Sequence, residues 1–383
     1  MRQRMIWVLP MLLFGVLAVA CSDDSGPTET DGSTKSDGLT KNDGPVTSDG
    51  PATSDGPATQ KDSGPKSDGS PPVNGQWTAV GPALASPQAG NFLTVEGEKI
   101  HASVQKSTTV SVQVLDSFAG TWKTVSGLSI PSSVSTQIPM VKHKGAVILG
   151  MPKGISSDDK KIFVKASGAT DFVVKTVGFT NNRGGIAYLW SDGTKIYGMA
   201  YNGLTSENFV TSADDGSTWT VSKQRGILFV SPAHRAFASG TRNFYYGDGA
   251  LHYCDDGGTS CTQIDVKTVK GAYSGAGDGT HVVVHAGGGG IAYSGDNGKT
   301  WTKVTPKKLM GMKSTMVFAD GCFYLSNMGG NIRSCDNGAT WDDITKGVPM
   351  ITAYVKSPAK MLVADGGFVY GFFGDQVYRF PTK

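Results

Sequence analysis

The chain has 383 residues, of which 38% are hydrophobic and 17% are charged, and its formal net charge is +3 at pH 7. With 52 glycines and few long amphipathic helical patterns, this composition excludes a mainly helical protein and favours many short strands and turns. The small net charge conceals an acidic segment near the N-terminus and a basic remainder.

The N-terminus carries an export signal. Arg2 and Arg4 precede an apolar run over residues 5–17, which is too short to span a membrane and ends in small residues before Cys21. This arrangement resembles a bacterial lipoprotein signal. The resemblance implies that residues 1–21 are removed or modified, that Cys21 carries the lipid, and that the protein is anchored in the cell envelope. An ordinary cleaved signal with an unrelated cysteine is the alternative.

The residue after the lipidation position indicates in which membrane the protein is anchored. Ser22 follows Cys21, whereas an aspartate at that place is the strong inner-membrane retention pattern. By resemblance, the outer membrane of a Gram-negative bacterium is therefore expected. A nucleic-acid partner is not expected for an exported chain.

Residues 22–75 consist mainly of Asp, Gly, Ser, Thr, Pro and Lys, and the six-residue unit Thr-Ser-Asp-Gly-Pro-Ala occurs twice over 47–58. Such a segment lacks the apolar surface needed to offset chain entropy, which predicts a disordered linker. Its acidic residues outnumber its lysines, so residues 76–383 are net basic. That excess is either an ordinary solvated surface or an indication of an anionic partner.

A repeat organises residues 76–383. Strand starts recur 40 to 49 residues apart, at Trp77, Trp122, Asp171, Trp219, Cys261, Trp301 and Trp341. Asp-Gly turns between short apolar runs, as at Asp320 and Asp365, recur with the same period. This spacing is typical of a four-stranded unit and predicts seven repeats.

Three of the repeats contain the pattern S-x-D-x-G-x-T-W. The Asp and Gly residues favour a tight turn, because Asp bonds the turn backbone and Gly adopts positive φ. The pattern residues are Ser212, Asp214, Gly216 and Trp219, then Ser294, Asp296, Gly298 and Trp301, and then Ser334, Asp336, Gly338 and Trp341.

This pattern resembles the Asp-box (BNR) repeat of sialidases, sortilin-type receptors and photosystem-assembly propellers. The resemblance implies an all-β fold, a seven-bladed β-propeller of four-stranded antiparallel blades over 76–383. It also implies that the boxes are structural and perform no chemistry. The chain opens on one strand at 76–80 and ends on a third strand at 375–380. We expect these two strands to pair and close the ring, which removes open sheet edges.

Four cysteines follow Cys21, an even number in an exported chain, which indicates disulfides. Cys254 and Cys261 flank one hairpin, and Cys322 and Cys335 fall on consecutive strands. We predict the pairs Cys254–Cys261 and Cys322–Cys335. Metal binding is the alternative, but no Cys-x-x-Cys motif or histidine cluster accompanies these residues.

The resemblance also separates two faces of the ring, because the box hairpins of that family lie opposite the usual ligand site. The ligand face is then built from loops between blades and loops joining second and third strands. The segment 222–235 is the longest such connection, and it is either a contact loop or a segment packed into the ring. The candidate ligand-binding residues are Arg183, Lys223, Arg225, Arg235, Tyr246 and His285.

Catalysis is the alternative function. Sialidases use three arginines, a Tyr–Glu pair and an acid/base Asp. Here the first arginine after the linker is Arg183, so the early member of the arginine set is missing. If the chain is a glycoside hydrolase, Tyr201, Glu207 and Asp248 are the candidate catalytic residues. No cofactor or metal motif is present in the sequence. We predict a monomeric envelope protein that binds a glycan or another envelope protein without turnover.

Overall fold

The structure, a computed structural model, describes residues 75–84, 90–106, 108–131, 138–151, 161–176, 185–202, 206–221, 227–228, 236–247, 250–255, 260–264, 274–286, 290–304, 306, 314–348, 359 and 361–383. All of them belong to one compact unit, Ser63–Lys383. Over these residues the regular structure consists of strands, and no helix is long and apolar enough to cross a bilayer.

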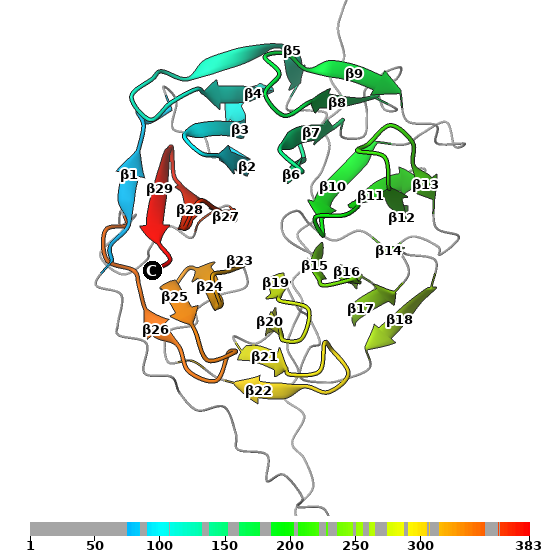
Figure 1. Ribbon diagram of the computed structural model, residues 1–383, viewed down its shortest axis with the longest axis vertical. Coiled ribbons are helices and arrows are strands. Elements are labelled where there is room, and N and C mark those ends of the chain that lie inside the picture. The colour runs from blue at the N-terminus through cyan, green and yellow to red at the C-terminus, as the bar shows by residue number, and fades with distance from the viewer. Residues whose placement is uncertain are drawn as a thin grey trace, which may run out of the picture. The chain divides into compact units, whose positions relative to one another are not determined.

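The strands form seven antiparallel sheets, which we call blades 1 to 7 (Figure 1). The strands of blades 1 to 3 are β2 (Gly90–Glu96), β3 (Lys99–Lys106), β4 (Thr109–Leu115) and β5 (Lys123–Pro131); β6 (Met140–His143), β7 (Ala146–Gly150), β8 (Lys161–Lys165) and β9 (Val173–Thr176); and β10 (Ile186–Ser191), β11 (Ile196–Asn202), β12 (Ser206–Ser212) and β13 (Thr220–Val221), with β14 (Ile227–Leu228) on β12.

Blades 4 to 7 continue the same order. Their strands are β15 (Ala236–Ser239), β16 (Arg242–Gly247), β17 (Ala250–Asp255) and β18 (Ser260–Ile264); β19 (Ser274–Gly277), β20 (Val282–Ala286), β21 (Gly290–Ser294) and β22 (Thr302–Val304); β23 (Ser314–Ala319), β24 (Cys322–Asn327), β25 (Gly330–Ser334) and β26 (Asp342–Asp343); and β27 (Leu362–Asp365), β28 (Phe368–Phe373) and β29 (Gln376–Pro381), with β1 (Thr78–Val80) completing blade 7.

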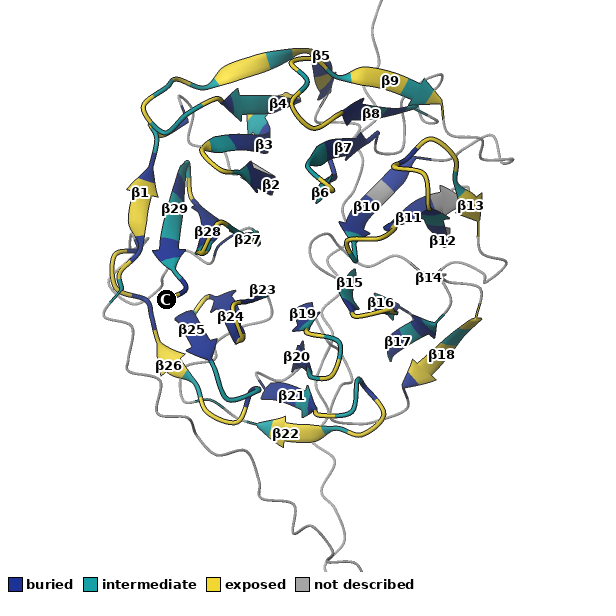
Figure 2. Ribbon diagram, in the orientation of Figure 1, coloured by how far each residue is buried: buried dark blue, intermediate teal, exposed yellow. Residues whose placement is uncertain are grey.

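The first strand of each blade lies at the centre of the ring. Neighbouring inner strands touch in the order β2, β6, β10, β15, β19, β23 and β27, and β27 touches β2 again. Burial is greatest in the second strands, such as β20 and β24, in which every residue is buried, while outermost strands such as β22 and β26 are exposed (Figure 2). The predicted all-β ring of seven four-stranded blades is therefore confirmed.

The predicted closure is also confirmed. Strand β1 pairs with β29 in antiparallel register, with Thr78 opposite Arg379 and Val80 opposite Val377. Beside this junction the side chain of Trp77 is 2% exposed, and its ring lies 5.1 Å from that of Phe373. The apolar clusters of blades 1, 6 and 7 meet around β1, so this short strand is held by packing as well as by hydrogen bonds.

The three repeated turns adopt one conformation. In blade 5, the Ser294 hydroxyl donates to the Asp296 carboxylate at 2.8 Å and accepts the Gly298 amide at 2.7 Å. The Trp301 indole N–H then donates to the Gly298 carbonyl at 3.0 Å. Gly298 has φ of +87° and Asn297 has φ of +53°, the left-handed conformations that these residue types tolerate. The same bonds recur in the turns at 212–219 and 334–341.

Both predicted disulfides are present. Cys254 and Cys261 lie directly opposite each other on β17 and β18, and Cys322 on β24 is bonded to Cys335 just beyond β25. Each bond therefore crosslinks strands within a single blade.

Candidate functional site

Most residues predicted for the ligand face lie outside the described part of the chain. These are Arg183, Lys223, Arg225, Arg235 and Asp248, and the same holds for the lipidation candidate Cys21. Their roles stay predictions.

The described part of that face brings three predicted elements together. Tyr201 on β11 pairs with Glu207 on β12, and Glu207 in turn lies opposite Ile227 of β14. The segment 222–235 thus contributes the short strand β14 to blade 3, and its role as a contact loop or as a segment packed into the ring stays a prediction.

The other two predicted ligand residues lie within strands. Tyr246 on β16 is half-buried and packs against the apolar cluster of blades 4 and 5. His285 on β20 is fully buried, and its Nδ1 atom lies 2.7 Å from the Ser314 hydroxyl. Burial lowers the pKa of His285 to about 4, so the imidazole is neutral at physiological pH. Ligand contact by either residue stays an untested prediction.

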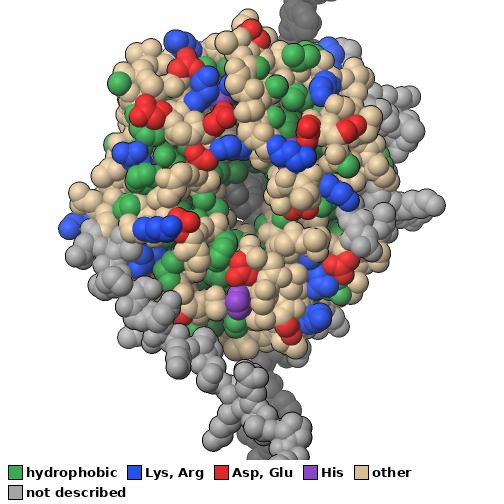
Figure 3. All heavy atoms as spheres, in the orientation of Figure 1, with side chains coloured by type: hydrophobic (Ala, Val, Ile, Leu, Met, Phe, Trp, Pro, Cys, Tyr) green, Lys and Arg blue, Asp and Glu red, His purple; other side chains and the backbone are tan. Residues whose placement is uncertain are grey.

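Two cavities of the described structure are large enough to bear on ligand binding. One, of about 300 Å³, lies on the ring axis and is lined by the inner strands of all seven blades. Side chains of both charge signs surround the central opening (Figure 3). The other, of about 690 Å³, lies between blade 1 and blade 2, and we call it the blade 1–2 groove.

A β-bulge in blade 1 shapes one wall of this groove. The pairing of β4 with β5 shifts between Ser111 and Gln113, so that β5 carries extra residues between Thr124 and Ser129. Gly127 has φ of +74° at this point, a conformation that glycine adopts without steric cost. The bulged residues 125–128 all line the groove, and Ser126 among them is exposed.

The opposite wall comes from β8 and the turn that follows it. Phe172 immediately precedes β9, as Trp301 precedes β22. Phe172 is therefore the blade 2 residue equivalent to the tryptophan of the repeated turn. The strand start predicted at Asp171 therefore lies one residue too early, because no tryptophan fixes the position in this blade. The Phe172 ring meets the His101 ring edge-on, with centroids 5.9 Å apart.

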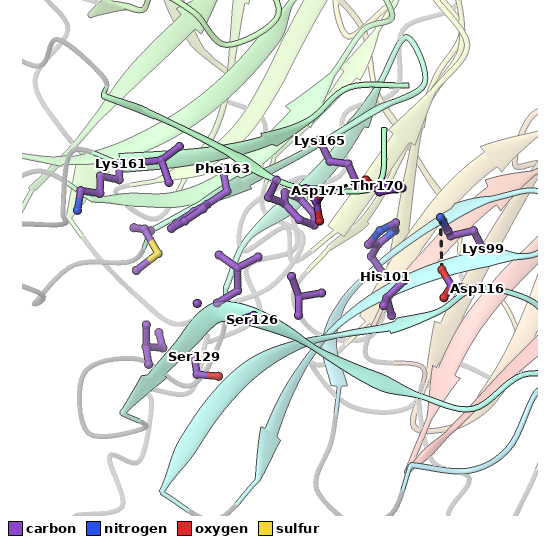
Figure 4. Close-up of a pocket in the computed structure, with 18 residues that line it drawn as sticks. Lys99, His101, Asp116, Ser126, Ser129, Lys161, Phe163, Lys165, Thr170 and Asp171 are labelled. Atoms are coloured by element: carbon purple, nitrogen blue, oxygen red, sulfur yellow. Dashed lines mark hydrogen bonds and ion pairs between the residues drawn. The ribbon is translucent and has the colours of Figure 1, made fainter. Parts of the chain in front are cut away.

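Lysine side chains lie at both ends of the groove (Figure 4). Lys161 lies at one end, and Lys99 and Asp116 lie at the other, joined by an ion pair of 3.3 Å. Lys123 also contacts Asp116, at 3.2 Å. The hydrogen bond from Lys123, together with Lys99, holds the pKa of the Asp116 carboxyl below its usual value. Asp116 is consequently a carboxylate whose charge is already neutralised.

Lys165 is the unusual residue of the groove. It is the last residue of β8, the place that Ser212, Ser294 and Ser334 hold in β12, β21 and β25. Those serines are 1–2% exposed, and Lys165 is 4% exposed. Burial, followed by repulsion from Lys99, lowers the pKa of the Lys165 amine.

His101, on β3, completes this end of the groove. Its side chain is 1% exposed, and no hydrogen-bond partner for its Nδ1 atom is found among the described residues. Burial and the nearby Lys165 and Lys99 lower the pKa of His101 to about 3, so the ring is neutral. A neutral imidazole and two lysines therefore surround one pocket, an arrangement suited to a negatively charged group.

Sequence reasoning did not find this groove, because it restricted ligand contacts to loops on one face. One signal was available: blade 2 has lysine where three other blades have the serine of the repeated turn. Elsewhere in the described chain, no three His, Cys, Asp or Glu side chains cluster as a metal site would require.

Seven four-stranded blades in a closed ring define the class of this chain as a seven-bladed β-propeller. No protein-family model matches it, and no curated protein matches it in sequence.

Among solved structures it is similar to YCF48 bound to a D1 peptide, with a TM-score of 0.55 and 11% identity over 80% of this chain and 95% of that chain. It is similar to YCF48 from Cyanidioschyzon merolae (TM-score 0.54, 11% identity, 80% and 99% covered) and to the WD40 repeats of RRP9 (0.51, 12%, 80% and 99%). At these identities the likeness concerns the fold.

Proposed function

We propose that this chain is a lipid-anchored binding protein of the cell envelope, and that its propeller holds a segment of a protein partner in the blade 1–2 groove. The observation that carries this proposal is the groove itself, an opening of about 690 Å³ between blades 1 and 2. The lipoprotein-like signal ending at Cys21 supports the anchor. The three repeated turns support a place among the Asp-box propellers.

The lining of the groove suits a polypeptide. Apolar side chains such as Phe163 and Val174 alternate with the charged residues, and Val174 on β9 is exposed. An extended peptide presents apolar and polar side chains in a comparable alternation. The fold likeness to YCF48, whose structure contains a D1 peptide, adds support for this class of partner.

Binding fits the electrostatics of the groove better than glycoside hydrolysis does. A glycosidase requires a carboxylic acid whose pKa is raised so that it can donate a proton. Asp116 and Asp171 both line the groove, and Asp116 has a lowered pKa because lysines hold its charged form. This carboxylate is therefore a poor proton donor.

Selection of random displayed peptides on the full chain tests the proposal. Ser126→Trp fills the groove from an exposed position on β5, and it should abolish binding of the selected peptides. Thr302→Trp is the matched control, because Thr302 is exposed on the outermost strand β22 and is not part of the groove lining. Peptides that bind both variants equally, or the absence of any selected peptide, would refute the groove as the binding site.

A further inference from the structure

Lys165 occupies a buried position that an uncharged serine occupies in blades 3, 5 and 6. Transferring an ammonium group from water to such a place costs free energy unless a negative charge or hydrogen bonds compensate. In blade 5 the corresponding Ser294 is satisfied by Asp296 and by the Gly298 amide. In blade 2 the residue at the Asp place is Ser167, so the compensating carboxylate of the turn is missing.

The surroundings do not replace that carboxylate. Within the described residues no ion pair joins Lys165 to an Asp or Glu, and Asp116 is already shared by Lys99 and Lys123. Glu96 and Asp116 favour the charged form of Lys165 only through space, whereas Lys99 disfavours it both by its charge and through a hydrogen bond between the two side chains. The pair Lys99 and Lys165 therefore leaves uncompensated positive charge at one end of a cavity.

We infer that Lys99 and Lys165 form a subsite for a carboxylate, the side chain of an aspartate or glutamate in the segment bound by the blade 1–2 groove. The carboxylate binds beside the two neighbouring lysine amines, facing the cavity, and accepts a hydrogen bond from each. His101 faces the same space, and a proton on its Nδ1 atom can be donated to the second oxygen. Neither lysine needs to leave its place, because the cavity already opens to both.

The polypeptide is the occupant that the walls favour. Val125, Phe163 and Phe172 give the groove apolar surface beside the charged end, which suits a segment that alternates acidic and apolar residues. Residues 22–75 of this chain are acidic but nearly devoid of apolar side chains. They would complement the lysines of the groove but not its apolar walls. The identity of the occupant rests on the proposed function, whereas the carboxylate subsite does not.

Nuclear magnetic resonance of the full chain, labelled with ¹³C at lysine Cε, tests the subsite directly. The probe is N-acetylglutamate methylamide, and N-acetylglutamine methylamide is its uncharged match. Lys99→Met and Lys165→Met assign the two resonances, and exposed Lys299 serves as the internal control. We expect the glutamate probe to shift the Lys99 and Lys165 signals saturably, while the glutamine probe leaves them unchanged. Equal shifts at Lys299, or none at Lys165, would overturn the subsite.

The nature of the occupant is tested separately, with peptides whose binding is lost in Ser126→Trp. Replacing one Glu or Asp by its amide should weaken binding to the wild type at least tenfold, and the loss should be clearly smaller in Lys165→Met, in which only Lys99 remains. Glucuronate is the competing probe. If glucuronate shifts the lysine signals at lower concentration than the glutamate probe does, an acidic glycan is the occupant and the polypeptide is rejected. A saturable glutamate shift without any groove-dependent peptide would likewise reject the polypeptide and keep the carboxylate subsite.

Discussion

Val80 lies directly opposite Val377, so the first and last strands of the propeller share one antiparallel pair. The Gln376 side-chain amide strengthens this junction by donating to the Val80 carbonyl at 3.0 Å and the Gly81 carbonyl at 2.9 Å. Blade 7 is therefore built from two distant parts of the chain, and its stability depends on both.

Replacing Trp77 by alanine should destabilise the whole ring. Trp77 is buried against Phe373 and Phe380, and removal of a buried aromatic side chain costs about 3–5 kcal/mol. Urea unfolding followed by circular dichroism would measure the loss. Thr78→Ala, an exposed change on β1, should alter the free energy of unfolding by less than about 0.5 kcal/mol. Equal effects of the two changes would show that the closing strand contributes little.

The repeated turn of blade 5 should make stability depend on acid pH. Burial alone would raise the pKa of Asp296, but hydrogen bonds from Thr300 and Ser294 outweigh it and lower the pKa to about 2. Because the folded pKa lies below the ordinary value of 3.8, this stabilisation is present above pH 4 and is lost as the pH falls toward 2.

Asp296→Asn should remove this dependence. The difference in unfolding free energy between wild type and variant should be largest near neutral pH and should shrink below about pH 4. Asp214 and Asp336 titrate in both proteins, so they cancel in the comparison. A difference that stays constant from pH 6 to pH 2 would contradict the role given to the Asp296 carboxylate.

Gly127→Ala should strain the bulge that shapes the groove. A Cβ at this position has open space around it, but φ of +74° is unfavourable for any residue with a side chain. The expected cost is about 1 kcal/mol, measured by thermal or urea unfolding. Ser126→Ala, at the neighbouring exposed position, should leave stability unchanged. If Gly127→Ala is neutral, the bulge does not require the left-handed conformation.

Lys165→Met should stabilise the protein while weakening carboxylate binding. It removes a buried ammonium group and should raise the free energy of unfolding by about 1–3 kcal/mol near neutral pH. Lys299→Met, an exposed change, should be nearly neutral. A destabilised Lys165→Met variant would mean that the surroundings already compensate the charge.

The same variant has a predicted response to alkaline pH. The folded state of the wild type releases the Lys165 proton at lower pH than the unfolded state does. Between these two values the unfolded state binds more protons, so the wild type gains stability as the pH rises toward 10.5. Lys99, Glu96, Asp116 and His101 surround the amine in both proteins. The advantage of Lys165→Met should therefore diminish at high pH.

Cys21→Ala should abolish lipid attachment. Expressed at full length in a Gram-negative host, the wild type should incorporate labelled palmitate and partition into detergent. The variant should do neither, whereas Ser22→Ala should behave as the wild type. Palmitate incorporation that survives Cys21→Ala would remove the basis for the anchor.

The repeats made the fold predictable. Ser294, Asp296, Gly298 and Trp301 encode a turn through local hydrogen bonds, which a sequence pattern records directly. The disulfides followed for the same reason, since Cys254 and Cys261 flank one hairpin. The closure of β1 on β29 followed from counting strands.

The groove was not predictable in the same way. It depends on the bulge at Gly127 in blade 1 and on the burial of Lys165 in blade 2, which are contributed by separate blades. A period in the sequence says where strands start, but it does not say which neighbouring blades leave space between them. Tyr246 and His285 illustrate the opposite error, since both lie in strands where loops were expected.

The junction of β1 with β29 has a consequence for biosynthesis. Gln376 and Val80 are 296 positions apart, so β1 emerges from the ribosome long before its partner exists. Contacts between such distant residues form slowly because loop closure costs entropy. Throughout that interval the outer edge of a nearly finished ring would be free to pair with another chain. The late arrival of β29, the partner of the three-residue strand β1, therefore decides how long the nascent protein needs protection by chaperones.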